Sequence, residues 1–465
     1  MKFRPLLVFV LGLLVSVSLF STETAAAPAM FKPGDRWVAV GDSITHSGSY
    51  HQWVQLYYVT RFPGFALDLV NCGISGDTAD AAIKRYGWDI APNLLSKKGS
   101  YASVMLGMND VTRSLYSADL KDPDVAQKRR ERIELHKTRM RELVGRLKKD
   151  GARVIIFTPS IFDDTADLER PYQSGVNSAL GECAEFDRAL AAETGAALVD
   201  FYAPMNAINR ERQQANHAFT IVGPDRIHPG PPGHLVMAYL FLKAQGVPAE
   251  VAKLSLDYED KKIVSASNGS AKKLSKKVSG KFLFTWTANA LPFPIDAEAK
   301  PATTWVPFAN DLNQEILQVT RLPWRRYLLQ IDGIDVRAYS AKELAQGVNL
   351  AIESGTPQNR QAAQVMMLVK QRAKLVSEQL RRIAQVEHQS APDIAHPVTA
   401  DQMKPYIDKR LEDDSISAAT RKILESYAAA KGQEATTRAE IARLEGAIRN
   451  AATPVKHEYI LIPED

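Results

Sequence analysis

A serine hydroxyl follows a strand-like segment near the start of this chain. Residues 37–40 are apolar and include two β-branched valines, the run breaks at Gly41, and Asp42 and Ser43 come next. Ligands of open α/β sheets bind beyond the carboxyl ends of the strands, so a strand that ends this way can expose a nucleophile. Serine is a poor nucleophile until a base removes its proton. The rest of the chain must therefore supply that base.

Asp225 and His228 provide an acid and an imidazole three positions apart. The imidazole could take the proton of Ser43, while the carboxylate fixes the ring's tautomer and stabilises its charged form. One loop can position both, because they are neighbours in sequence. Each feature alone has a plainer explanation: Ser43 could be a turn serine that caps a helix, and Asp225 with His228 could be a structural pair.

Apolar runs also precede Gly76 and Asn109, in the segments 66–78 and 103–110. If these runs are parallel neighbours of the strand before Ser43, their ends converge on one edge of a sheet. A glycine lets backbone approach a substrate closely. Asn109 offers a neutral amide donor, although it could equally belong to a simple turn.

These four blocks, in this order, resemble the SGNH or GDSL-type serine hydrolases over roughly the first half of the chain. The resemblance implies that Ser43 is the nucleophile, His228 the base and Asp225 its partner. It assigns the oxyanion hole to the backbone N–H groups of Ser43 and Gly76 and to the side-chain amide of Asn109. We expect neither a cofactor nor a metal. The Gly-x-Ser-x-Gly elbow of α/β-hydrolases is absent around the serine.

Strand-like and helix-like segments alternate over residues 29–249, which predicts a parallel sheet covered on both faces. The resemblance makes this an α/β, flavodoxin-like three-layer fold, the SGNH hydrolase fold. The sequence pattern changes at about residue 250, and we predict a C-terminal accessory region over residues 250–465. It should be β-rich over 280–340 and helical over 341–450, with a possible returning strand at 458–462.

Local signals mark three positions in this second half. Asp332-Gly333 is a favoured two-residue hairpin turn. Ser340 begins a capping box, and Thr356 with the following proline caps a longer helix.

Several side chains carry weaker functional hints. The lysine-rich segment 261–277 predicts a solvated linker, which could also meet an anionic polymer. Core packing explains the second-half tryptophans better than sugar binding does; they are Trp286, Trp305 and Trp324. Among histidines near the motifs, His46 and His51 could line the pocket, whereas His234 opens an apolar helix and is predicted to be structural.

Length and composition limit the remaining possibilities. A chain of 465 residues predicts at least two domains. The formal charge of +5 is small for this length and gives no case for nucleic-acid binding. Cys72 and Cys183 could form a bridge, but burial as small apolar side chains is the commoner fate of cysteine. The sequence does not indicate an oligomeric state.

The N-terminus has the layout of a secretory signal peptide, which we place at residues 1–27. No later stretch is apolar enough to span a membrane. We therefore expect a secreted or periplasmic protein.

The resulting expectation is an exported serine esterase that hydrolyses small acyl esters through a Ser43 acyl-enzyme. The resemblance favours O-acetyl groups on carbohydrate. A lipase, a lysophospholipase or a thioesterase is the enzymatic alternative. The alternative from another class is a catalytically inactive cell-surface protein that binds glycans or serves as a scaffold.

Overall fold

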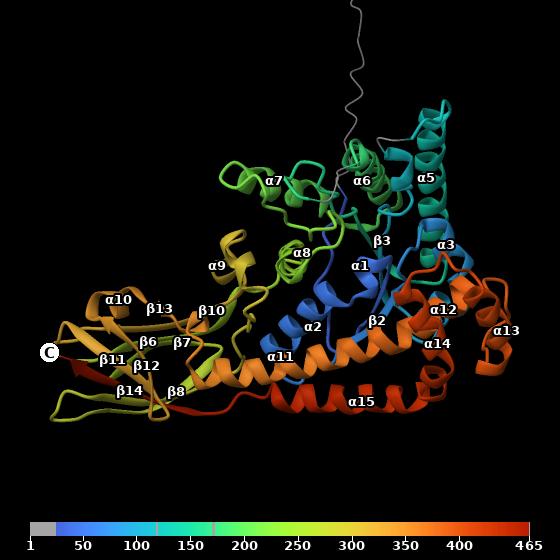
Figure 1. The fold of residues 1–465 in the computed structure, drawn as a ribbon. Coiled ribbons are helices and arrows are strands. Elements are labelled where there is room, and N and C mark those ends of the chain that lie inside the picture. Colours follow the sequence, from blue (N-terminus) through green and yellow to red (C-terminus); the bar gives the residue numbers. More distant parts are fainter. Residues whose placement is uncertain (1–24, 118–119, 170–172, 465) are drawn as a thin grey trace, which may run out of the picture.

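The computed structural model describes residues 25–464 except 118–119 and 170–172 (Figure 1). Most of the predicted signal peptide therefore lies outside the described residues. Ala26, near the start of the described chain, forms a parallel bridge to Ala197. In this part of the chain no helix is both long and apolar enough to cross a membrane.

A five-stranded parallel sheet with the order β2-β1-β3-β4-β5 forms the centre of the first half. Its strands are β1 (Arg36–Gly41), β2 (Asp68–Gly73), β3 (Tyr101–Met105), β4 (Arg153–Phe157) and β5 (Ala197–Val199). This is the strand order of flavodoxin-like folds. The predicted α/β fold is confirmed.

Helices cover both faces of this sheet, and the residues of β1 divide between them. Trp37 and Ala39 belong to one buried cluster, whereas Val38 and Val40 belong to another. The first cluster includes side chains of α2 (Ser49–Arg61), α7 (Tyr202–Gln213) and α8 (Pro231–Ala244). The second includes side chains of α3 (Ala79–Lys84), α4 (Ala91–Leu95), α5 (Val125–Lys149) and α6 (Val176–Thr194). Alternate residues of a strand point to opposite faces, so a sheet buried on both sides requires this continuous apolar run.

The chain then forms two further sheets that share one core. One has the order β13-β10-β6-β7, from β6 (Glu250–Asp257), β7 (Lys262–Ser267), β10 (Gln314–Thr320) and β13 (Val348–Asn349). The other has the order β12-β11-β14-β9-β8, from β8 (Gly269–Lys276), β9 (Phe282–Ala288), β11 (Arg326–Ile331), β12 (Ile334–Ser340) and β14 (His457–Glu464). The short helices α9 (Phe308–Leu312) and α10 (Ala341–Gln346) connect strands of this lobe. Strands thus begin well before the predicted residue 280.

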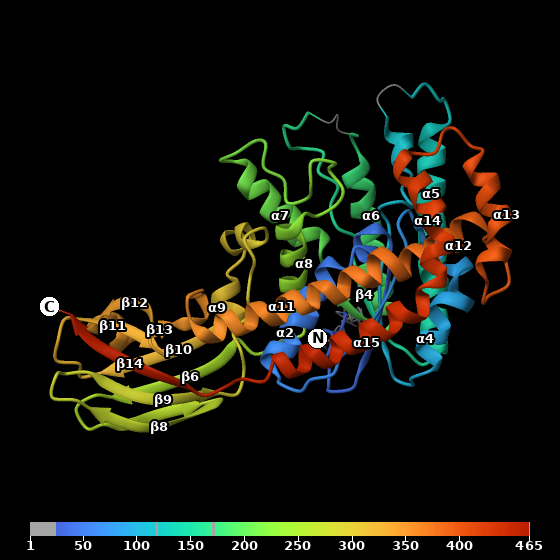
Figure 2. The same cartoon turned by 60° about the horizontal axis from the view of Figure 1, so that its bottom comes forward.

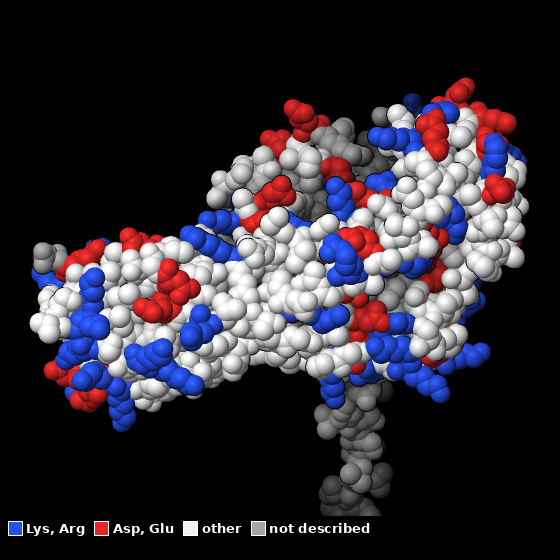
Figure 3. Space-filling model, turned by 90° about the horizontal axis from the view of Figure 1, so that it is seen from below, with Lys and Arg blue, Asp and Glu red and all other residues white. Residues whose placement is uncertain are grey.

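The lysine-rich segment is not the linker that we predicted, because residues 262–276 form the edge strands β7 and β8. Its lysines are exposed, and Figure 3 shows Lys and Arg side chains over the lobe on the left. Charged side chains on an edge strand oppose pairing with another chain. Trp286 is buried in the lobe's core, whereas Trp324 is 38% exposed.

A helical segment leaves this lobe, crosses the first half of the chain and returns (Figures 1 and 2). It consists of α11 (Pro357–Leu375), the π-helical turn η5 (Val376–Leu380), α12 (Arg381–Ser390), α13 (Ala400–Leu411), α14 (Ala418–Gly432) and α15 (Glu434–Ala451). Helix α11 packs against α2 and α15, and β14 then enters the lobe between β9 and β11. The predicted returning strand is confirmed, as are the hairpin at Asp332 and the caps at Ser340 and Thr356.

The two halves of the chain share a core. Val365 and Val369 of α11 and Ile448 of α15 are buried in the same cluster as Trp53 and Tyr57 of α2. The C-terminal helices therefore cover an apolar face of the first half.

The two cysteines, Cys72 and Cys183, are both buried and are not bonded to each other.

Candidate active site

Ser43 is the first residue of the short helix α1 (Ser43–His46), directly beyond the carboxyl end of β1. Asp42 caps this helix, and its Oδ1 accepts the N–H of Ile44 at 3.0 Å. A Cβ at Gly41 would lie 2.2 Å from the hydroxyl of Thr45, so only glycine fits at the bend. The first N–H groups of a helix have no intrahelical acceptor. The N–H of Ser43 is therefore left for another acceptor.

The structure brings Ser43, His228 and Asp225 together in one hydrogen-bonded row. Ser43 Oγ lies 2.7 Å from His228 Nε2, and His228 Nδ1 lies 2.5 Å from Asp225 Oδ2. The other oxygen of Asp225 accepts the backbone N–H groups of Ile227 and His228, both at 3.0 Å.

Protonation of this row follows from its hydrogen bonds. Burial raises the pKa of Asp225, but the bonds from the His228 side chain and from the two backbone N–H groups hold it below its ordinary value. An ionised carboxylate only accepts, so His228 Nδ1 carries the proton and Nε2 accepts the Ser43 hydroxyl. In this arrangement the hydroxyl proton can pass to the imidazole as the oxygen attacks.

Arg226 anchors the loop that carries Asp225 and His228. This role of Arg226 was not predicted from the sequence. It is 2% exposed and has a φ of 68°, an uncommon value for a residue other than glycine. Its guanidinium donates to the carbonyls of Asp163 and Ala166, both at 3.0 Å. Its own carbonyl accepts the N–H of Asp163 at 3.0 Å. Arginine is rarely buried unless it is paired, so no local pattern in the sequence indicates this anchor.

Gly76 and Asn109 follow the strands on either side of β1. Gly41 pairs with Gly73 of β2 and with Met105 of β3, so both loops leave the sheet at the level where α1 begins. Gly76 has a φ of 87°, which favours glycine. Asn109 Nδ2 donates to the carbonyl of Asp77 at 3.0 Å. An amide nitrogen has two N–H groups, so one remains for another acceptor.

A buried carboxylate ties these two loops together. Asp110 accepts the N–H of Gly107 at 3.0 Å and that of Ala79, at the start of α3, at 2.9 Å. Its Oδ1 also lies 3.1 Å from the Nδ1 of the buried His136. The loop of Asn109 is thereby fixed to the helix that follows Gly76.

Ser43 and His228 open into a cleft of about 500 Å³. Side chains from the first half of the chain form one part of its lining, including Ser47, Ser49, Gln52 and Trp53. The C-terminal part contributes Asp296, Glu298, Lys370, Lys374 and Glu378. Among the described residues that line this cleft, Gly76 and Asn109 do not appear. All the residues predicted for the site lie in the first half of the chain, and the wall formed by α11 was not predicted.

Two of the three nearby histidines have structural hydrogen bonds. His46 Nε2 lies 3.0 Å from the carbonyl of Ser377, and His51 Nε2 lies 2.9 Å from that of Thr45. His234 is buried but lines the cleft. Burial lowers the pKa of His46 and of His51 to about 4, and that of His234 to about 3. These three rings are therefore neutral near pH 7.

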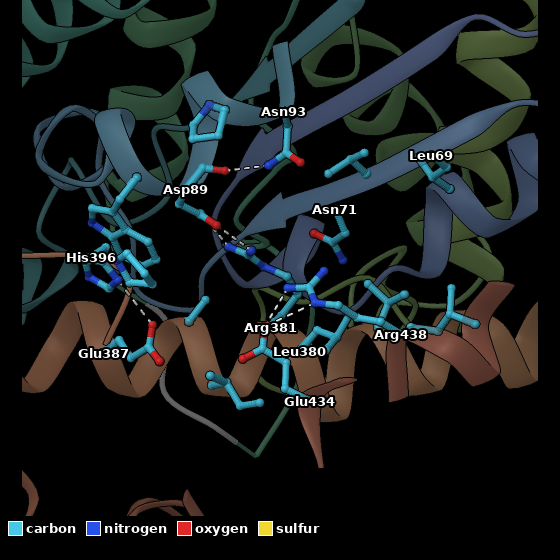
Figure 4. Close-up of a pocket in the computed structure, with 18 of the residues that line it drawn as sticks. Leu69, Asn71, Asp89, Asn93, Leu380, Arg381, Glu387, His396, Glu434 and Arg438 are labelled. Atoms are coloured by element: carbon cyan, nitrogen blue, oxygen red, sulfur yellow. Dashed lines mark hydrogen bonds and ion pairs between the residues drawn. The ribbon is translucent and has the colours of Figure 1, made fainter. Parts of the chain in front are cut away.

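A larger cavity, of about 750 Å³, lies away from Ser43 between β2 and the C-terminal helices (Figure 4). Arg381 binds both oxygens of Asp89 at 2.7 Å, and Lys431 lies 2.8 Å from Glu387. These ion pairs join helices to one another and to the first half. We therefore interpret the cavity as part of the interface between the two halves.

Asp42 gives a pH-dependent prediction for stability. Burial raises its pKa to about 7, and the hydrogen bond from Ile44 offsets only part of that effect. The folded protein thus holds this proton more tightly than the unfolded chain does, so stability falls as the pH rises from about 4 to 7. Asp42→Asn keeps the acceptor and removes the titration. Between pH 5 and pH 8, the free energy of unfolding measured with urea should fall by about 1–3 kcal/mol less in the variant than in the wild type. Equal losses in both proteins would contradict this prediction.

Comparisons with known proteins agree with this arrangement. Residues 39–236 match the model of the GDSL-like Lipase/Acylhydrolase family. An acetylxylan esterase from Geobacillus stearothermophilus is 25% identical over an alignment of 228 residues, and the match covers 46% of this chain and 94% of that protein. A solved structure described as a gut microbial diltiazem-metabolizing enzyme is 30% identical, with a TM-score of 0.85. The match covers 94% of this chain and 100% of that one, so the likeness extends through the C-terminal half.

Proposed function

Since this chain belongs to the GDSL-like lipase/acylhydrolase family and is a serine ester hydrolase, we propose that it removes small acyl groups, acetyl above all, from carbohydrate. The observation that carries this proposal is the hydrogen-bonded row of Ser43, His228 and Asp225 at the edge of a cleft that many hydrogen-bonding side chains line. The acetylxylan esterase relative supports the substrate class. The N-terminal pattern supports an exported enzyme, which would meet extracellular glycans.

In the proposed reaction, Ser43 Oγ attacks the ester carbonyl while His228 Nε2 takes the hydroxyl proton. The backbone N–H groups of Ser43 and Gly76 and the free amide N–H of Asn109 stabilise the oxyanion. The tetrahedral intermediate collapses, the C–O bond to the carrier breaks, and the imidazolium protonates the departing alcohol. Water, deprotonated by His228, then attacks the acyl-enzyme and releases the carboxylic acid together with free Ser43.

The composition of the cleft favours a hydroxyl-rich carrier. Side chains with hydrogen-bonding groups predominate around the serine, and they come from separate parts of the chain: Gln52 from α2, Lys374 from α11, and Asp296 from the loop after β9. Sugar hydroxyls can exchange hydrogen bonds with such groups, whereas a long acyl chain would desolvate them without replacing their bonds. The same argument disfavours the lipase and lysophospholipase alternatives.

An ester panel tests this proposal. It contains acetylated xylo-oligosaccharides, diltiazem, an acyl thioester, and a series of acetyl to palmitoyl esters of one alcohol. We expect the highest kcat/KM for acetyl esters, with a fall of at least roughly tenfold by the octanoyl ester, because a longer acyl chain would desolvate the hydrogen-bonding groups of the cleft without replacing their bonds. Acetylated oligosaccharides should have a lower KM than acetyl esters of small alcohols. A preference for palmitoyl esters or for the thioester would contradict the proposal.

A further inference from the structure

The C-terminal helix α12 reaches the loop that carries Gly76. Its first residue, Arg381, binds both oxygens of Asp89 and donates from Nε to the carbonyl of Gly73 at 3.1 Å. Gln389, two turns further along the same helix, donates from Nε2 to the carbonyl of Ser75 at 2.9 Å. Residues more than three hundred positions apart are thereby joined beside the candidate oxyanion hole.

The preceding peptide of this loop is fixed as well. The N–H of Ser75 donates to His46 Nδ1 at 3.2 Å, and His46 Nε2 lies 3.0 Å from the carbonyl of Ser377 in η5. A ring that accepts at Nδ1 must be neutral and must carry its proton on Nε2, which then donates to Ser377. Burial and the nearby Arg381 lower the pKa of His46 to about 4, which keeps the ring neutral.

The bond from Gln389 has a specific consequence for Gly76. The carbonyl of Ser75 and the N–H of Gly76 belong to the same peptide group, and in a trans peptide they point in opposite directions. A donor held on the carbonyl side therefore fixes the direction of the N–H on the other side. It also polarises the amide and makes the N–H a stronger donor.

We propose that Gln389 is a positioning residue for catalysis, which aims and strengthens the Gly76 N–H through the carbonyl of Ser75. The C-terminal helical segment then supports the oxyanion hole by binding the Ser75 carbonyl, on the side of the peptide opposite the Gly76 N–H, in addition to lining the cleft. This inference rests on the oxyanion role that the proposed function gives to Gly76. It concerns the rate of acyl transfer and makes no demand on the identity of the carrier.

Three substitutions in the full-length protein test this role. Gln389→Ala removes the donor, Gln389→Glu keeps the size of the side chain without the N–H, and Gln389→Lys restores a donor. Gln389 is exposed, so these changes should leave the melting temperature close to that of the wild type. The control is Gln371→Ala, an exposed glutamine of α11.

For an acetyl ester at pH 8, we expect Gln389→Ala and Gln389→Glu to lower kcat roughly tenfold with little change in KM, a smaller effect than the loss of an oxyanion donor. Gln389→Lys should regain most of the rate. The affinity for a boronic acid that mimics the tetrahedral intermediate should fall with kcat.

Three results would contradict the expectation. Wild-type rates in all three variants, or a change in KM alone, would overturn the positioning role while leaving the esterase proposal intact. Failure of the wild type to hydrolyse any ester of the panel would overturn the proposed function itself, and the positioning role with it.

Discussion

Replacement of Ser43 by alanine should abolish ester hydrolysis, with kcat lowered by roughly 10⁴- to 10⁶-fold, as for loss of the nucleophile in other serine hydrolases. The hydroxyl of Ser43 lies 2.7 Å from the ring nitrogen of His228 and opens into the cleft, so it is the hydroxyl that His228 can deprotonate to form the acyl-enzyme. Initial rates on a chromogenic acetyl ester measure the loss. Labelling by a fluorophosphonate probe measures the covalent step directly.

Ser47→Ala is the matched control for this experiment. Ser47 lies one turn further along the chain and lines the same cleft, but its Oγ donates to the carbonyl of Ile44 at 2.8 Å. This variant should keep the wild-type rate within a few-fold. If the wild-type protein itself neither labels nor hydrolyses any ester, the expectation fails, and a binding or scaffold protein becomes the better interpretation.

The fold of the first half could be predicted because each strand carries its own local signal. Residues 37–40 are apolar on both faces of the sheet, which is the pattern of a strand buried between two helical layers. The caps at Ser340 and Thr356 were predictable for the same reason, since a cap depends on residues only a few positions away. The edge strands β7 and β8 were not, because their exposed lysines have the composition of a solvated loop.

The row of Ser43, His228 and Asp225 could be predicted because a family pattern joins residues that are far apart in the sequence. The contributions of Arg226, Gln389 and α11 could not. The positions of Gln389 and α11 depend on how the C-terminal helices pack against β2 and α2, and no local pattern records a contact across three hundred residues. Arg226 is held by the carbonyls of Asp163 and Ala166, about sixty residues earlier, and no local pattern records that contact either. An exposed glutamine on a polar helix face is also ordinary in composition.

A chain shortened to end at residue 249 should not fold into a soluble esterase, although residues 29–249 contain every residue predicted for catalysis. The C-terminal helices bury an apolar face of the first half: Val365 and Val369 are at most 1% exposed and share a core with Trp53. Their removal would uncover that face and take away Arg381, which binds both oxygens of Asp89, so that Asp89 would keep only its ion pair with Arg85. Exposed apolar patches of this kind promote aggregation. Size-exclusion chromatography and circular dichroism of the shortened protein test the expectation.

A point substitution separates this packing argument from a general effect of truncation. Val369→Asp in the full chain buries a charge against α2 and should lower the free energy of unfolding by several kcal/mol, on the order of 3–5, as uncompensated buried charges do. Met367→Asp is the control on the same helix, because Met367 is 67% exposed and the substitution should cost well under about 1 kcal/mol. A shortened chain that is soluble, melts cooperatively and keeps the wild-type kcat on acetyl esters would show that the first half is an independent enzyme. In that case the contacts of α11 and α12 with the site would have no catalytic role.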